Sequence, residues 1–272
     1  MKVSQALAWA AGAGVERREA DLLLLHALGR WHDRAWLIAH DEDAVTDQAL
    51  HRYQRLCQRC HRGEPLAYLT GRQEFYGLEL HVDRRVLVPR PDTETLVDWA
   101  LDLELSPQTR AIDLGTGSGA LALALKHQRP DWAVSGLDTS SAALTVARAN
   151  GTRLGLGIAW MEASWLEGVA GPFELIVSNP PYIAEGDPHL PALRHEPPQA
   201  LTAGAGGLDA LTTLIAQAPS RLTPGGWLLL EHGHRQAAAV RGLLIRAGFK
   251  NVQTRADLAG IERCTGGQRP HT

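Results

Sequence analysis

Asp113-Leu114-Gly115-Thr116-Gly117-Ser118-Gly119 is the stretch that decides the fold, because it joins a strand to a helix through a turn with three glycines. Ala111-Ile112 precede it as the end of an apolar strand, and the alternating Ala and Leu of residues 120–125 follow it as a helix. Glycine lets a ligand approach the backbone closely, and a helix N-terminus offers free N–H groups. This order of elements predicts an α/β domain with a ligand site at the turn.

A second predicted strand, residues 133–137, ends about twenty residues after the turn at Asp138. At this distance an acidic side chain can accept hydrogen bonds from ribose hydroxyls. Two cofactors remain open at this point. Residues 115–120 satisfy a relaxed dinucleotide fingerprint, which favours NAD. Asp113 before the first glycine, with a third glycine in the run, is typical of S-adenosylmethionine enzymes, in which the acid lies near the methionine ammonium group.

Strands and helices alternate from Pro91 to the end of the chain. Alternation requires right-handed crossovers and a mostly parallel sheet with helices on both faces. The last two strands leave no room for a helix between them, so one of them should be antiparallel. Strands are expected near residues 110–114, 132–138, 158–162, 173–178, 226–232, 249–255 and 261–265, and helices near 119–129, 140–154, 208–222 and 235–247.

The amino-terminal part of the chain has a different pattern. Residues 1–72 show apolar side chains at helical spacing only, which predicts a helical domain. The alternating residues that follow predict a β-hairpin with its turn at Asp83-Arg84 and its second strand at residues 86–88. We therefore expect a helical domain over 1–72, a hairpin connector over 73–90 and an α/β domain over 91–272.

Composition excludes several classes of protein. Lys and Arg number 27 against 30 for Asp and Glu, so the net charge is −3. A protein that binds a nucleic-acid backbone over a large area is usually basic, so stable nucleic-acid binding is not expected. No apolar stretch approaches the roughly 18 residues that span a bilayer. Residues 6–13 only faintly resemble a signal peptide and fit a helix face, so a cytoplasmic location is expected.

The cysteines and histidines point to no cofactor of their own. Three cysteines, an odd number, do not suggest a disulfide framework. Cys57-Gln58-Arg59-Cys60-His61 matches the attachment pattern of c-type haem, but Cys57 and Cys60 share a helix face with Tyr53, and haem attachment would require export. Packing is the better interpretation of both cysteines. The 12 histidines are scattered, so no metal site is expected.

The segment Ser178-Asn179-Pro180-Pro181-Tyr182 follows another apolar run, residues 173–177. Proline fixes its own φ and favours extended geometry in the residue before it, so Asn179 and the Pro180 carbonyl become rigid hydrogen-bonding groups at the end of a strand. Two fixed acceptors suit a planar –NH2 group, which offers two N–H donors and a face for Tyr182 to cover. Asn-Pro and Pro-Pro are also ordinary turn signals, so the segment alone leaves both interpretations open.

Together the two motifs resemble the class I methyltransferases that modify planar amino groups. The segment Asn179-Pro180-Pro181-Tyr182 is shared with adenine-N6 and cytosine-N4 DNA methyltransferases, and Pro-Arg-Pro-Asp-Thr-Glu about ninety residues upstream makes the match much more specific. This combination resembles the bacterial N5-glutamine methyltransferases that act on peptide chain release factors. Other segments that carry the resemblance are residues 87–94, 187–190, 229–233 and 263–267.

The resemblance implies a fold and a set of site residues. The fold is α/β, a mostly parallel, seven-stranded, Rossmann-like class I methyltransferase sheet with an N-terminal helical domain. The catalytic residues would be Asn179, Pro180 and Tyr182, and the substrate would contact Asn179, Pro180, Pro181 and Tyr182. S-adenosyl-L-methionine would contact Asp113, Gly115, Thr116, Gly117, Ser118, Gly119, Asp138, Trp165 and Asn179.

The resemblance also implies a substrate. In this family the methyl acceptor is the Gln of a Gly-Gly-Gln loop in class-I peptide chain release factors, and the helical domain helps to dock that protein. Three alternatives stay open: a glutamine of a ribosomal protein, an amino group of a nucleic-acid base, and a cofactor-bound docking module without turnover. No membrane partner is expected.

Overall fold

The computed structural model describes residues 1–31 and 33–271 and divides into two compact units, residues 1–72 and 73–272. Apolar side chains from the helices of the first unit meet in one core, which contains Tyr53 and Cys57. Cys57 and Cys60 are free and buried, which confirms that they are packing residues. The described helices of this unit are α1 (Val3–Gly12), α2 (Arg17–Leu28), α3 (Arg34–Ala39), α4 (Asp47–His61) and α5 (Leu66–Thr70).

A two-stranded hairpin follows, with β1 (Arg72–Phe75) paired to β2 (Leu78–His81). Its turn is Tyr76-Gly77, where both residues have positive φ, 51° and 77°. Gly77 adopts this conformation without steric cost, and the Glu74 carboxylate accepts a hydrogen bond from its N–H at 2.6 Å. The hairpin is therefore closed by a short left-handed turn inside the segment that the sequence suggested as one strand.

The predicted turn at Asp83-Arg84 and strand at residues 86–88 are wrong. Asp83 accepts a hydrogen bond from the backbone N–H of Arg85 at 3.0 Å, so this segment is a local loop held by its own aspartate. Residues 86–88 belong to no strand, although Val86 and Val88 are buried. The alternating apolar residues here are therefore buried without pairing to β2.

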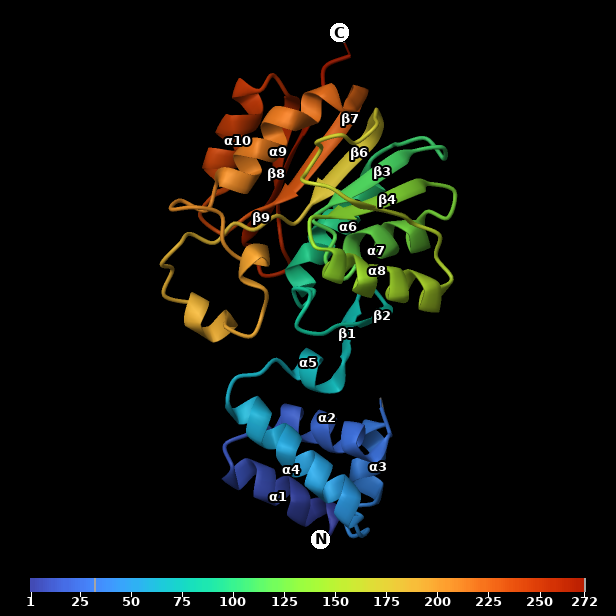
Figure 1. Cartoon of the computed structure of the whole chain (residues 1–272), viewed down its shortest axis with the longest axis vertical. Helices are drawn as coiled ribbons and strands as arrows, with labels where there is room; N and C mark the ends of the chain where they lie inside the picture. The colour runs from blue at the N-terminus through green and yellow to red at the C-terminus, as the bar shows by residue number, and fades with distance from the viewer. Residues whose placement is uncertain (32, 272) are drawn as a thin grey trace. The chain divides into compact units, whose positions relative to one another are not determined.

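The α/β domain is built on a seven-stranded sheet in the order β5-β4-β3-β6-β7-β9-β8 (Figure 1). β9 is antiparallel to both of its neighbours and the other pairs are parallel, which confirms the predicted mostly parallel sheet with one reversed strand. The strands are β3 (Arg110–Leu114), β4 (Ala133–Asp138), β5 (Ala159–Glu162), β6 (Phe173–Ser178), β7 (Leu222–Glu231), β8 (Lys250–Ala256) and β9 (Glu262–Gln268).

Helices cover both faces of this sheet (Figure 1). Ala111 of β3 packs in a core with α6 and α7, whereas Ile112 and Leu114 pack in a second core with α9 and α10. A parallel strand buried on both faces needs apolar residues at successive positions, as this strand has. The helices are α6 (Glu94–Asp102), α7 (Ala120–Gln128), α8 (Ser141–Leu154), α9 (Asp209–Gln217) and α10 (Ala237–Arg246), with 3-10 turns η1 (Pro91–Thr93), η2 (Leu190–Leu193), η3 (Pro198–Ala200) and η4 (Ala218–Ser220).

The strand order reverses between β3 and β6, because the chain continues from β3 to β4 on one side and returns to β6 on the other. Ligands of open α/β sheets bind at such a switch point, outside the carboxyl ends of the strands. The glycine turn follows β3 and the Asn-Pro-Pro-Tyr segment follows β6, so the topology brings both motifs to this crevice.

Candidate functional site

The glycines of the turn after β3 differ in the space around them: Gly117 faces open space and Gly119 is tightly packed. Gly115, Gly117 and Gly119 all have positive φ, 72°, 54° and 87°. A β-carbon on Gly117 would meet no atom within 4 Å, whereas one on Gly119 would lie 2.9 Å from the Trp160 ring. Gly115 and Gly117 line the cavities described below, and Gly119 does not. The first two glycines thus leave room for a ligand, and the third lets α7 pack closely.

Asp138, at the end of β4, is held by the backbone on both of its oxygens. Oδ2 accepts a hydrogen bond from the Gly117 N–H at 2.9 Å, and Oδ1 accepts one from the Ser140 N–H at 2.9 Å. A carboxylate offers about four lone-pair sites, so two remain for hydroxyl donors. These two hydrogen bonds fix the side chain in place and leave about half of its lone pairs free to accept hydrogen bonds from a ligand.

Asp113, at the end of β3, is buried beside the same turn. Its Oδ2 accepts a hydrogen bond from the Thr116 hydroxyl at 2.6 Å and one from the Ala122 N–H at 3.3 Å. Its Oδ1 has no partner among the described residues. Burial raises the pKa of this carboxyl to about 7, against the opposing hydrogen bond from Thr116. A buried acceptor of this kind requires a donor, and a cationic donor would restore the ionised form.

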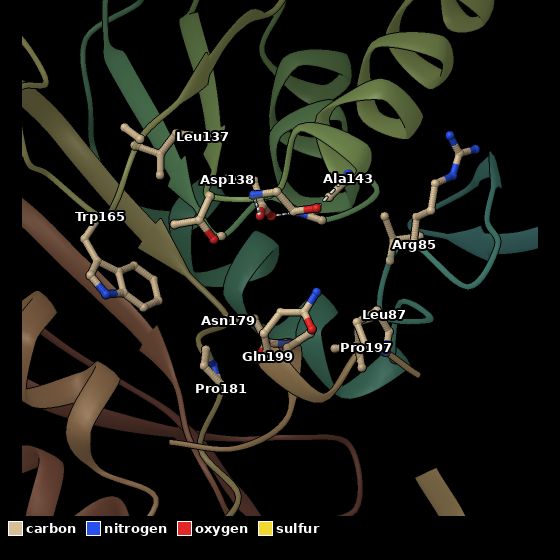
Figure 2. A pocket seen from close by; sticks show the side chains of 17 residues that line it. Arg85, Leu87, Leu137, Asp138, Ala143, Trp165, Asn179, Pro181, Pro197 and Gln199 are labelled. Carbon is tan, nitrogen blue, oxygen red and sulfur yellow. Dashed lines mark hydrogen bonds between the residues drawn. The ribbon is translucent and has the colours of Figure 1, made fainter. Parts of the chain in front are cut away.

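Three neighbouring cavities lie along the carboxyl ends of β3 and β6, and Asn179 and Leu87 line all three. The first, of about 120 Å³, also contacts Asp138, Trp165 and Pro181. Figure 2 shows Asp138 on one side of this space, Asn179 and Gln199 on the other, and the Trp165 ring at its edge. The second, of about 330 Å³, contacts Arg90, Pro180, Tyr182 and Leu193. The third contacts Asp113, Thr116, Ser118 and Thr93.

Asn179 thus lies on a wall that the three cavities share. Every residue of the predicted site lines at least one of the three cavities, except Gly119, which lines none of them. Trp165 adopts positive φ, 50°, in the segment after β5, and its ring lies 3.7 Å from where a Gly115 β-carbon would be. It also packs on the core beneath. This residue therefore both supports the turn and lines the cavity.

Two buried residues beneath the Asn-Pro-Pro-Tyr segment were missing from the predicted site. The Asn179 Nδ2 group donates a hydrogen bond to the Thr93 hydroxyl at 3.1 Å, and the Tyr182 hydroxyl donates one to Glu231 Oε1 at 3.0 Å. Burial raises the pKa of the Glu231 carboxyl to about 7, and hydrogen bonds from Thr93 and Tyr182 oppose that shift. Thr93 and Glu231 both lie in segments that carry the family resemblance. For Glu231, an acidic residue at the end of an apolar strand was the signal in the sequence that could have identified it as a site residue.

The segment from Ile183 to Gly207 forms a rim over the second cavity. Arg90 pairs with the buried Glu196 at 2.6 Å, which ties the rim to the segment before α6. Gln236 donates hydrogen bonds to the carbonyl oxygens of Tyr182 at 3.0 Å and Gly207 at 3.1 Å. Both ends of the rim are therefore anchored beside the Asn-Pro-Pro-Tyr segment.

The geometry fits S-adenosylmethionine. Asp113 offers an unpartnered buried acceptor for an ammonium group, Asp138 has capacity for hydroxyls, and Gly117 leaves open space between them. Within residues 1–31 and 33–271, no group of three or more His, Cys, Asp or Glu side chains is arranged to hold a metal ion. In the same part of the chain, no helix is long and apolar enough to cross a membrane.

Comparison with known proteins identifies both units. Residues 3–71 match the family model of the PrmC N-terminal domain, and residues 93–261 match that of the methyltransferase small domain. A methyltransferase from Pyrococcus furiosus has a similar fold, with a TM-score of 0.56 at 19% identity over 71% of this chain and 90% of that chain.

Two curated relatives extend over nearly the whole chain. Release factor glutamine methyltransferase of Xylella fastidiosa strain Temecula1 is 48% identical over 97% of this chain and 98% of its own length. Release factor glutamine methyltransferase of Escherichia coli strain K12 is 42% identical over 93% of this chain and 92% of its own length. The chain is therefore an S-adenosylmethionine-dependent methyltransferase, and at this identity and coverage it belongs to the family of release factor glutamine methyltransferases.

Proposed function

We propose that the chain transfers the methyl group of S-adenosylmethionine to the side-chain amide nitrogen, N5, of the glutamine in the Gly-Gly-Gln loop of class-I peptide chain release factors. The observation that carries this proposal is the position of Asn179 at the junction of the cavities. Its Nδ2 end faces Thr93, so the Oδ1 end is available to accept a hydrogen bond from an amide substrate. The names of the full-length relatives support the choice of protein substrate.

An amide nitrogen is a poor nucleophile, because its lone pair is delocalised into the carbonyl. A general base would help little, since neutral amides are very weak acids. We infer that Asn179 Oδ1 and the Pro180 carbonyl accept the two amide hydrogens and Tyr182 packs on the amide plane, which bends the nitrogen toward tetrahedral geometry. Bound S-adenosylmethionine supplies an electrophilic methyl group on a sulfonium. Once the nitrogen has gained the methyl group, it gives up one of its two hydrogens as a proton to water. Positioning of this quality lowers a barrier by roughly 7–11 kcal/mol.

The cofactor contacts follow from the polar groups of the first and third cavities. Asp113 Oδ1 would accept from the methionine ammonium, with the backbone from Gly115 to Ser118 around the methionine end. Asp138 would accept from the ribose hydroxyls, and Trp165 would lie against the adenine. The hydrogen-bond capacity of Asp138 and the open side of the glycine turn support this assignment.

Residues 1–72 are proposed as the docking domain for the protein substrate. They form a compact unit with its own core and match a separate family model, while the residues that line the cavities belong to the other unit. We thus assign docking of the protein substrate to residues 1–72, connection to residues 73–90 and methyl transfer to residues 91–272.

The proposal is tested by incubating the protein with labelled S-adenosylmethionine and three purified substrates: release factor, ribosomes and DNA. Label should appear in the release factor and be lost when its loop glutamine is replaced by Glu, because only the amide can accept the methyl group. The Asn179→Ala variant serves as the inactive control. Label in a ribosomal protein or in DNA, with none in the release factor, contradicts the proposed substrate.

A further inference from the structure

The second cavity, on the far side of Asn179 from the cofactor cavity, has few side chains that can donate a hydrogen bond. Apart from Arg90, Asn179 and Tyr182, its lining residues are apolar or proline. Two of these three donors are already engaged, because Asn179 Nδ2 donates to Thr93 at 3.1 Å and the Tyr182 hydroxyl donates to Glu231 at 3.0 Å. Arg90 therefore carries most of the side-chain donors that remain at this cavity.

The Arg90 guanidinium is held at one corner only. Its Nη2 donates to Glu196 Oε1 at 2.6 Å, and its side chain is 39% exposed. The Glu196 side chain is 2% exposed, and its Oε2 has no partner among the described residues, so the pair is not the two-bonded fork that arginine often forms. A guanidinium has five N–H groups, which leaves about four for other acceptors. The buried acid thus holds Arg90 at the cavity wall without using up its donors.

The proposed substrate brings acceptors of one kind into this cavity. Two glycines precede the acceptor glutamine, and since glycine has no side chain, the polar groups beside the glutamine side chain are those of the main chain. A carbonyl group that leaves water for apolar surroundings costs free energy unless it accepts a hydrogen bond. A cationic N–H donor on the cavity wall would supply a strong one.

The chemistry of methyl transfer restricts which carbonyl Arg90 can contact. A donor on the side-chain carbonyl of the glutamine would strengthen delocalisation of the nitrogen lone pair and oppose its attack on the methyl group. A donor on a main-chain carbonyl of the loop has no such effect. The main-chain carbonyls are therefore the acceptors that suit both the guanidinium and the reaction.

We propose that Arg90 is a substrate-binding residue that donates hydrogen bonds to a main-chain carbonyl of the glycines before the acceptor glutamine. This inference rests on the proposed function, in which that loop enters the second cavity. It gives a role to the Pro-Arg-Pro-Asp-Thr-Glu segment, which the cofactor contacts do not explain. Arg90 would hold the loop while Asn179 and Pro180 hold the amide.

The test uses the full-length protein, S-adenosylmethionine and intact release factor in steady-state kinetics. Arg90→Met removes the guanidinium and keeps a long apolar stem. We expect KM for release factor to rise about tenfold to a hundredfold, the size of one hydrogen bond to a charged group, with kcat and S-adenosylmethionine affinity within about twofold of wild type. Arg148→Met is the matched control, since Arg148 is exposed on α8 and lines none of the three cavities.

A second pair of variants separates substrate binding from support of the rim. Arg90→Met leaves the buried Glu196 without its partner, which by itself could disturb the rim. Glu196→Gln keeps an acceptor oxygen for Arg90, so alone it should raise KM by no more than about threefold. The double variant Arg90→Met with Glu196→Gln leaves no buried carboxylate unpaired, and its KM should stay as high as that of Arg90→Met.

Two results overturn the proposal: a folded Arg90→Met variant with unchanged KM, or a double variant whose KM returns to that of Glu196→Gln. The second result would mean that the arginine acts only by neutralising Glu196. Circular dichroism of each variant checks that it is folded. Absence of labelled release factor with the wild-type protein contradicts the proposed function instead, so the two failures are distinguishable.

Discussion

Replacing Asp113 with Asn separates the cost of burying this acid from its use in binding the cofactor. Asp113 is 1% exposed, and its Oδ1 has no partner among the described residues. Burial raises its pKa from 3.8 to about 7, with hydrogen bonds from Thr116 and Ala122 opposing the shift. The folded protein without cofactor therefore holds this proton more tightly than the unfolded chain does.

The sign and size of the effect on stability follow from linkage. Between pH 4 and pH 7 the folded state binds more protons than the unfolded state, so this group lowers stability as pH rises through that window. About three pKa units correspond to about 4 kcal/mol above pH 7. Asn carries no charge, but its amide leaves a buried donor unpaired at a cost of about 1–3 kcal/mol. Asp113→Asn should thus be about 1–3 kcal/mol more stable than wild type at pH 8.

Urea denaturation of the cofactor-free protein at pH 5 and pH 8 measures this effect. The stability difference between variant and wild type should grow by about 3 kcal/mol over that range. Calorimetry should show S-adenosylmethionine binding about tenfold to a hundredfold weaker in the variant, since a charge-assisted hydrogen bond is lost. Exposed Asp131→Asn is the control and should change neither quantity. Equal pH dependence of the Asp113 variant and wild type, or unchanged cofactor binding, would refute the reasoning.

Three further predictions concern the turn, the acceptor site and the helical unit. Asn179→Ala should abolish nearly all of kcat and Asn179→Asp should keep part of it, because only the second retains an acceptor oxygen; steady-state kinetics on release factor decides this, and a near-normal kcat for the Ala variant contradicts it. Gly117→Ala should weaken cofactor binding in calorimetry and lower Tm modestly, because its β-carbon would enter open space but the residue has positive φ. Gly119→Ala should lower Tm more and weaken cofactor binding less, since its β-carbon would also strike the Trp160 ring; the reverse pattern would refute this assignment. Deleting residues 1–72 should raise KM for intact release factor far more than it weakens cofactor binding; a folded truncated protein with normal KM disproves the docking role.

Much of the α/β domain follows from local pattern. Successive apolar residues in β3 and β6, each ending in a polar motif, are the signal of parallel strands buried on both faces, and the structure confirms them. The hairpin was harder to place, because the left-handed turn at Tyr76-Gly77 interrupts an alternating run that also reads as one strand. The position of this turn depends on the positive φ of Gly77 and on the hydrogen bond from its N–H to Glu74. The alternation of apolar and polar residues reveals neither.

The sequence by itself determined the order of strands and helices, the glycine turn and the Asn-Pro-Pro-Tyr segment, because each depends on residues that are close along the chain. Only the tertiary structure decided that Thr93 and Glu231 lie beneath Asn179 and Tyr182. Thr93 precedes Asn179 by 86 residues and Glu231 follows Tyr182 by 49. The second contact arises because the strand order of the sheet brings the carboxyl ends of β6 and β7 together. The first joins η1, which precedes α6, to the segment after β6, and no local pattern encodes either meeting.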